Sequence, residues 1–174
     1  MIGILERIGI DYMVSGSFAS SLHGAPRMTR DADLVIESDE AKIRAFVRAL
    51  GEDFYADEEA AAQAVRLCDL FNVVHLESGL KIDLIVRKDR PFSREEFSRR
   101  SAGTIEGRSA MFVTPEDAIL SKLEWAKKGN SDRQRIDALE VIRVQGDRLD
   151  WAYLERWAKE LGLGESLDRL KREV

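Results

Sequence analysis

The sequence predicts an α/β (α+β) protein, with a mixed β-sheet core flanked by helices and a helical bundle at its C-terminal end. Strand-like and helix-like segments alternate over residues 1–114, whereas the pattern over residues 115–174 is entirely helical. The chain has 174 residues, 44% of them hydrophobic, which is enough to bury a core without disulfides or metals. We therefore expect a core domain over 1–114 and a helical subdomain over 115–174.

Composition and charge exclude several classes of protein. A net charge of −5 argues against a broadly basic surface for nucleic acid, although a local basic patch stays open. The single cysteine, Cys68, excludes an intramolecular disulfide and a cysteine-based zinc cage. No apolar run reaches the roughly 18 residues that span a membrane, and no signal-peptide pattern is visible. We expect a cytoplasmic protein with no membrane partner.

The first part of the chain predicts a helix over 1–9, a strand over 10–15, a short helix over 18–22, a strand over 31–37 and a helix over 39–50. Gly9 ends the first helix, and the Gly16-Ser17 turn opens the second. Ser38 is expected to cap the last of these helices, in which Ile43 and Phe46 belong to one apolar stripe.

The middle of the chain predicts a strand over 54–56, a helix over 57–65, strands over 70–77 and 80–86, a helix over 93–99 and short strands over 103–107 and 111–113. The Ser78-Gly79 turn would join two of these strands in a hairpin. Thr114 and Asp117 form a capping-box-like helix start, with Pro115 at the favoured first position. The helices expected from there on cover about 115–128, 131–144, 150–161 and 164–172.

Three aspartates stand in strands that are otherwise apolar. Asp31 and Asp33 point to the same face, roughly 6.6 Å apart at Cα, because side chains alternate along a strand. Asp83 lies within the apolar strand 80–86, where aspartate is uncommon. Like charges 4 Å apart repel by about 4 kcal/mol at an effective dielectric of 20. A divalent cation with oxygen ligands, such as Mg²⁺, would remove this repulsion, so we expect the three acids to meet at a metal site.

The Gly16-Ser17 turn suits a phosphate beside that metal. Glycine lets the backbone approach a ligand closely, and a helix N-terminus presents free N–H groups to an anion. Ser17 adds a hydroxyl group. The structural alternative is that the pair is only a good helix start.

These features together resemble the DNA polymerase β-type nucleotidyltransferase superfamily, which has a glycine turn, a helix, an acid-x-acid strand and a third acid on a neighbouring strand. The matching segments are Gly16-Ser17, Asp31-Ala32-Asp33 and Asp83. The resemblance covers about residues 10–90 and, more loosely, 115–140. Ser17 departs from the second glycine of many relatives.

Within this superfamily the chain looks like the AbiEii/MenT branch. The residues that carry this likeness are Gly24, the run from Arg27 to Asp33, Lys122 and Asp137. That branch includes toxins of toxin–antitoxin pairs, so the resemblance implies tRNA as one acceptor and a cognate antitoxin as one partner.

The resemblance also implies the roles of individual residues. The catalytic and metal-binding residues would be Asp31, Asp33 and Asp83, which hold Mg²⁺ in a two-metal site with the nucleoside triphosphate (NTP) between the ions. The nucleotide-binding residues would be Gly16, Ser17, Arg27, Thr29 and Lys122. The implied reaction transfers a nucleoside monophosphate from the NTP to an acceptor hydroxyl or phosphate.

Other interpretations stay open at this point. Arg27, Thr29 and Arg30 would otherwise neutralise surface acids, and Lys122 would otherwise extend along an apolar helix face to solvent. Arg133 and Asp137, four residues apart, would otherwise form a surface ion pair. We expect His23 and His75 to be structural, and the three tryptophans of the C-terminal helices to pack in the core, namely Trp125, Trp151 and Trp157.

Two further functions compete with RNA modification. One is a small-molecule, antibiotic-type nucleotidyltransferase, and the other is a non-catalytic nucleotide-binding or protein-interaction module with the same fold. If RNA binds, the expected basic surface consists of Arg87, Lys88, Arg90, Arg94, Arg99 and Arg100.

Overall fold

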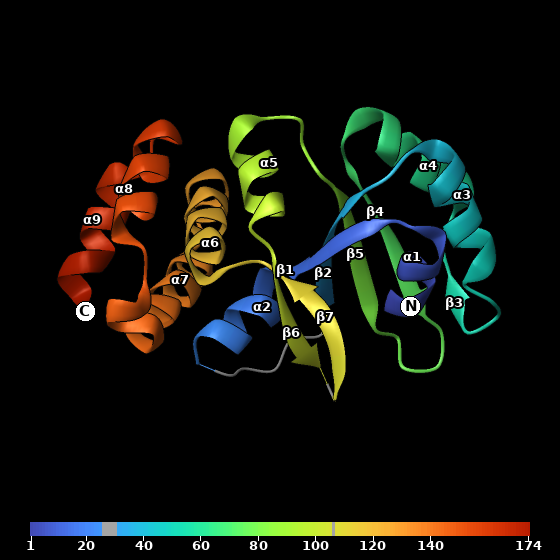
Figure 1. Ribbon diagram of the computed structural model, residues 1–174, viewed down its shortest axis with the longest axis horizontal. Coiled ribbons are helices and arrows are strands. Elements are labelled where there is room, and N and C mark those ends of the chain that lie inside the picture. The colour runs from blue at the N-terminus through green and yellow to red at the C-terminus, as the bar shows by residue number, and fades with distance from the viewer. Residues whose placement is uncertain (26–30, 106) are drawn as a thin grey trace.

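The computed structural model describes residues 1–25, 31–105 and 107–174. In these residues a seven-stranded mixed sheet has the order β3-β4-β5-β2-β1-β7-β6 (Figure 1). The strands are β1 (Asp11–Ser15), β2 (Asp31–Glu37), β3 (Phe54–Tyr55), β4 (Leu70–His75), β5 (Lys81–Val86), β6 (Ser101–Ile105) and β7 (Arg108–Phe112). At the centre, β2 runs antiparallel to β1 and parallel to β5. The expected hairpin of β4 and β5 is confirmed.

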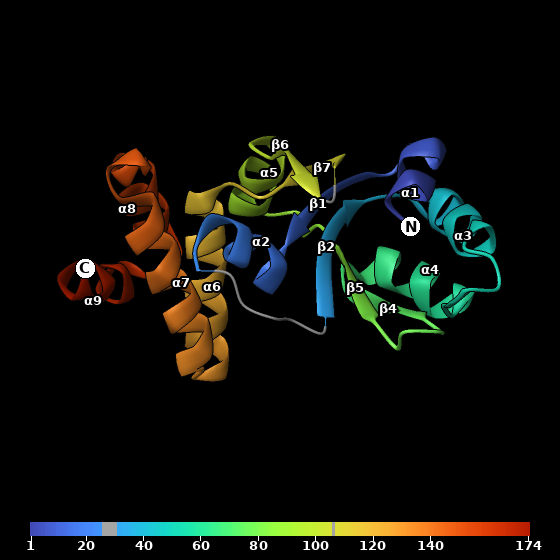
Figure 2. The ribbon, with the colours of Figure 1, turned by 90° about the horizontal axis from the view of Figure 1, so that it is seen from below.

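Three helices pack on one side of the sheet, as Figure 2 shows: α1 (Ile2–Ile8), α3 (Glu40–Ala49) and α4 (Glu58–Leu67). Leu34 and Ile36 of β2 are buried in a hydrophobic cluster with Ile43 and Phe46 of α3. Because side chains alternate along a strand, Asp33 and Val35 face the opposite side of the sheet. The face of β2 that carries Asp33 is therefore determined by Leu34 and Ile36, which must be buried on the opposite face.

The remaining helices lie on the other side of the sheet and beyond it (Figures 1 and 2). They are α2 (Gly16–His23), α5 (Pro91–Ser98), α6 (Pro115–Gly129), α7 (Asp132–Gln145), the short 3₁₀ helix η1 (Gly146–Arg148), α8 (Trp151–Glu160) and α9 (Gly164–Glu173). The C-terminal helices bury a second hydrophobic cluster that includes Leu120, Ile142 and Trp157. Phe92 of α5 joins this cluster and contacts Trp157 edge-on, so α5 packs against the bundle.

The expected elements are present, with shifted ends. Asp39 rather than Ser38 caps α3, because the Asp39 carboxylate accepts a hydrogen bond of 2.8 Å from the Lys42 amide. Ser38 instead donates to the Asp39 carbonyl oxygen. No helix in the described residues is both long enough and apolar enough to cross a membrane.

A buried polar cluster joins the first turn of α6 to the rest of the chain. Asp117 is fully buried and accepts hydrogen bonds from the Thr114 hydroxyl at 2.7 Å, the Tyr153 hydroxyl at 2.5 Å and Arg99 Nε at 3.2 Å. Burial raises the pKa of Asp117, while these hydrogen bonds act in the opposite direction. The cluster therefore holds α6, α8 and the segment after α5 together through one carboxylate.

We expect Tyr153→Phe to lower the free energy of unfolding by about 1–3 kcal/mol, because it removes one hydrogen bond from a buried charged group. Tyr55→Phe is the matched control, since Tyr55 is 61% exposed, and it should change stability by less than about 0.5 kcal/mol. Urea unfolding of both variants provides the measurement. Equal effects of the two changes would show that the Tyr153–Asp117 hydrogen bond contributes nothing to stability.

Candidate active site

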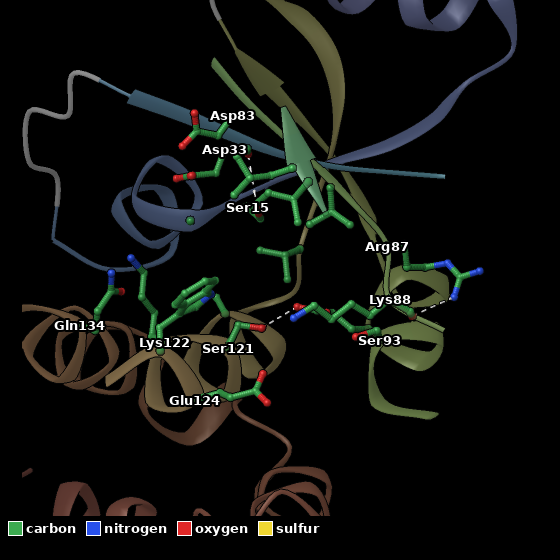
Figure 3. A pocket seen from close by; sticks show the side chains of 18 of the residues that line it. Ser15, Asp33, Asp83, Arg87, Lys88, Ser93, Ser121, Lys122, Glu124 and Gln134 are labelled. Atoms are coloured by element: carbon green, nitrogen blue, oxygen red, sulfur yellow. Dashed lines mark hydrogen bonds between the residues drawn. The ribbon is translucent and has the colours of Figure 1, made fainter. Parts of the chain in front are cut away.

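The register of β2 and β5 brings two of the predicted acids side by side. Asp33 pairs with Asp83, and Asp31 pairs with Lys81. Residues in register on parallel strands project from the same face, so the Asp33 and Asp83 side chains share one side of the sheet. Figure 3 shows them together on the sheet wall of a cavity. The structure thus joins residues from two strands that the sequence alone leaves separate.

Gly16 is packed against the Asp33 side chain. A Cβ atom at position 16 would lie 1.9 Å from Asp33 Oδ2 and 2.5 Å from its Cγ. Gly16 also has a φ of +60°, which residues with a side chain rarely adopt. Both observations require glycine here, so the first residue of α2 packs directly against the Asp33 carboxylate.

The charge of Asp33 is unfavourable in its surroundings. Burial raises the pKa of Asp33, and the nearby charge of Asp83 raises it further. The backbone hydrogen bond from Ser17 and the positive charge of Lys122 act in the opposite direction. Asp33 is therefore a carboxylate with excess negative charge around it, which is the electrostatic setting that attracts a cation.

Asp83 is held by two neighbours that the sequence analysis missed. Asn72 of β4 donates a hydrogen bond of 2.6 Å to Asp83 Oδ1, and Lys81 Nζ lies 3.0 Å from the same oxygen. Asn72 is the register partner of Asp83 across the β4–β5 hairpin. The hairpin itself was predictable, but a two-residue turn at Ser78-Gly79 would have set Val74 opposite Asp83. The actual loop is two residues longer, which shifts the register and places Asn72 there.

Asp31 lies at the exposed first position of β2 and is not among the residues that line the cavity. Its negative charge nevertheless raises the pKa of Asp33 slightly. Among the described residues, no three His, Cys, Asp or Glu side chains are gathered closely enough to hold one metal ion. The role of Asp31 as a third ligand stays a prediction.

The pair of Asp33 and Asp83 fits a hard divalent cation. Both groups offer carboxylate oxygens, and their mutual repulsion would be relieved by a positive ion between them. Protein Mg²⁺ sites use one or two carboxylates together with substrate phosphates and water. Asp33 and Asp83, two adjacent carboxylates beside the Gly16-Ser17 turn, fit that requirement.

Lys122 is buried, with 4% of its surface exposed, and does not extend to solvent. Its Nζ donates a hydrogen bond of 3.0 Å to Asp137 of α7 and one of 3.3 Å to the Ser17 hydroxyl. Asp137 is itself buried, so it is not part of a surface ion pair with Arg133, which is exposed. The lysine from α6 therefore reaches the start of α2, next to the acids.

A cavity of about 310 Å³ lies between the sheet and the helices α5, α6 and α7. Asp33 and Asp83 are on its sheet wall, and Lys122 extends from α6 on the opposite wall (Figure 3). Two further residues of the lining, Glu96 of α5 and Trp125 of α6, were not predicted as site residues. Trp125 is 54% exposed, so the expectation that it packs in the core was wrong, whereas Trp157 is buried as expected.

The segment that contains Arg27, Thr29 and Arg30 lies outside the described residues, so their predicted roles stay predictions. His23 and His75 have structural contacts: His23 Nε2 lies 2.7 Å from the Val113 carbonyl oxygen, and His75 Nδ1 lies 2.8 Å from the Ser78 hydroxyl.

The arginines of the expected basic surface are paired with acids. The ion pairs are Arg87–Glu37, Arg90–Glu124, Arg94–Asp89, Arg99–Glu116, Arg99–Asp117 and Arg100–Asp11. Because each arginine has a carboxylate partner, this region offers less positive charge to a polyanion than its sequence suggests.

A scan of protein-family models and a comparison with curated protein sequences both find no match for this chain. Solved structures do match. An antigenic nucleotidyltransferase-like protein from Paracoccidioides brasiliensis is similar with a TM-score of 0.57 and 18% identity, over 94% of this chain and 87% of that one. ANT(2'')-Ia in complex with adenylyl-2''-tobramycin is similar with a TM-score of 0.58 and 16% identity, over 92% and 91%. The lincosamide antibiotic adenylyltransferase LnuA, lincomycin-bound, has a TM-score of 0.53 and 11% identity, over 80% and 90%.

These likenesses show the fold. The chain has the mixed α/β architecture of nucleotidyltransferases, and it spans most of the length of the structures that it matches. The sequence identities are too low for the likeness alone to assign an activity or a branch.

Gly16→Ala should destabilise the protein more than Gly79→Ala does. Both glycines have positive φ, +60° and +67°, but a Cβ at position 79 would meet nothing within 4 Å. The conformational cost, about 1–2 kcal/mol, is common to both variants, and steric overlap with Asp33 adds about 1–3 kcal/mol at position 16. Urea unfolding measures the difference. Equal losses would mean that Gly16 is needed only for its backbone angle.

Glu96 predicts a pH dependence of stability. Burial raises its pKa from 4.5 to about 7, so the folded state binds a proton more tightly than the unfolded state. Stability should therefore fall as pH rises from about 4.5 to 7, by about 3 kcal/mol at most. Glu96→Gln does not titrate, so thermal unfolding of wild type and variant should diverge across this range, with the variant more stable at pH 8. A constant difference between them would contradict the assignment.

Proposed function

We propose that this protein is a nucleotidyltransferase that moves a nucleoside monophosphate from an NTP to an acceptor hydroxyl or phosphate and releases pyrophosphate. The observation that carries the proposal is the Asp33–Asp83 pair, which lies beside the Gly16-Ser17 turn and the buried Lys122 in one cavity. The nucleotidyltransferase fold of the solved neighbours supports it. Because the substrate is an NTP, we propose that the protein acts in the cytoplasm.

In this proposal one group of residues binds the phosphates and another holds the metal. Ser17 and Lys122 would hold phosphate oxygens, since both present donors at the start of α2. Asp33 and Asp83, with Asp31, would hold Mg²⁺, which when bound neutralises the charge on the transferred phosphoryl group. The acceptor oxygen bonds to the α-phosphorus as the bond to the pyrophosphate oxygen breaks, and Asp83 would accept the acceptor proton.

The Lys122 side chain is also held in place before a nucleotide binds. Its ion pair with buried Asp137 fixes the side chain before any nucleotide arrives. A lysine that is already ordered loses little conformational freedom on binding, so the phosphate site is partly pre-formed.

The acceptor that the observations favour is a small molecule. The arginines of the candidate RNA surface are already paired with acids, and the chain has a net charge of −5. Two of the solved neighbours are described with adenylyl-2''-tobramycin and with lincomycin. These facts support an antibiotic-type substrate over an extended RNA.

A second candidate is an AbiEii/MenT-like toxin that modifies tRNA and is neutralised by an antitoxin. The Lys122–Asp137 pair supports it, because that branch carries a lysine and a later aspartate on C-terminal helices. Expression that slows bacterial growth, and does so no longer with Asp31→Ala, would favour the toxin. Normal growth with full activity on a small-molecule acceptor would reject it.

Asp33→Asn should reduce NMP transfer by at least about a hundredfold, because it removes one of the two adjacent carboxylates. The assay incubates purified protein with labelled NTPs, Mg²⁺ and candidate acceptors. Asp53→Asn makes the same chemical change at an exposed position and should retain full activity. Equal transfer by wild type and Asp33→Asn would refute the site, and NTP binding without transfer to any acceptor would favour the non-catalytic module.

A further inference from the structure

The cavity lining around Ser121, which bonds to Glu96 and lies one turn before Trp125 on α6, contains groups that the proposed chemistry does not use. Trp125 of α6 is 54% exposed although it is a tryptophan, and it is part of the cavity lining. It lies three residues after Lys122, so the two side chains leave the same face of α6, one turn apart. An exposed aromatic ring therefore stands next to the proposed phosphate site.

Glu96 of α5 is the second unused group. It is 92% buried, since 8% of its surface is exposed, and it lines the same cavity. The Ser121 hydroxyl donates a hydrogen bond of 2.6 Å to Glu96 Oε1. In the described part of the chain this is the one side-chain hydrogen bond that Glu96 makes, so its second oxygen, Oε2, stays available to whatever fills the cavity.

The neighbouring carboxylate of Glu124 is already paired. Glu124 receives two hydrogen bonds from Arg90, of 2.5 and 2.6 Å, and lies 3.3 Å from Lys128 Nζ. Lys128 Nζ also lies 5.7 Å from the centre of the Trp125 ring, which places a positive charge beside the ring. Glu96 is therefore the carboxylate that remains to recognise a ligand in this part of the cavity.

We propose that this part of the cavity is a nucleobase subsite, in which Trp125 stacks on the base and Glu96 accepts a hydrogen bond from its exocyclic amino group. The proposal rests on the proposed function, because the phosphates are assumed to lie at Ser17 and Lys122. An aromatic ring offers a face to any base. An acceptor that faces the exocyclic group of the base favours bases with an amino group, namely adenine, cytosine and guanine, over uracil, whose exocyclic groups are carbonyl oxygens and cannot donate.

The direct test is calorimetric binding of the four α,β-methylene NTP analogues at pH 8, where Glu96 with its pKa of about 7 is mostly ionised. Mg²⁺ is present, and inorganic tripolyphosphate is the probe for phosphate binding alone. The A, C and G analogues should bind wild type at least about tenfold more tightly than the U analogue. Trp125→Ala should weaken the first three by about tenfold or more and leave tripolyphosphate unchanged. Tyr55→Ala removes an exposed aromatic ring elsewhere and should change nothing.

Glu96 is tested by two variants. Glu96→Met removes the acceptor and should make the affinity for the U analogue equal to that for the other three. Glu96→Gln keeps an amide oxygen as acceptor and should still bind the U analogue more weakly than the others. Both replace a buried acid with a neutral side chain of similar size, so we expect both variants to fold. Equal binding of all four analogues to wild type would overturn the subsite, as would an unchanged affinity of Trp125→Ala for the A analogue.

The two proposals fail separately. NMP transfer that depends on Asp33 but shows no base preference in binding would overturn the subsite and leave the transferase intact. Base-selective binding without transfer to any acceptor would overturn the transferase and leave the subsite. Failure of all four analogues to bind would overturn the subsite.

Discussion

The carboxylates of Asp33 and Asp83, held side by side on neighbouring strands, determine which groups surround them. The β2–β5 register sets Asp33 against Asp83, and burial adds to their mutual repulsion. The surrounding groups reduce that cost: Asn72 and Lys81 contact Asp83, and the Ser17 amide and Lys122 stabilise the charge of Asp33. A sheet that served only as a scaffold would gain stability by replacing one of these acids, so their pairing points to function.

The cavity depends on contacts between distant parts of the chain. Its sheet wall comes from β2 and β5, while its helix wall comes from α5 and α6. Lys122 joins the two by reaching from α6 to Ser17 at the start of α2, and the Asp117 cluster holds the first turn of α6 in place. The sheet and the C-terminal helices each have their own hydrophobic cluster. The polar contacts between the two parts position the cavity walls and leave the space between them open.

Much of the fold followed from local patterns. The apolar stripe with Ile43 and Phe46 marked α3, and the apolar run after Asp33 marked β2 as a strand. The structure buries Leu34 and Ile36 of that strand in the core. Errors occurred where several local signals competed. Ser38 was predicted to cap α3, but in the structure Asp39 caps it, because the Asp39 carboxylate accepts a hydrogen bond from the Lys42 amide. Trp125 was assigned to the core from its apolar character, but its face of α6 borders the cavity.

The sequence by itself determined that Asp31 and Asp33 share a face, that Asp83 lies in a buried strand, and that a glycine turn precedes a helix, because these are properties of neighbouring residues. Only the tertiary structure decided that Asp83 stands beside Asp33, that Lys122 is paired with Asp137, and that Glu96 and Trp125 border the same space. Strand register and helix docking depend on burying apolar surface across the whole chain. The local spacing of apolar residues predicts neither the register of the strands nor the docking of the helices.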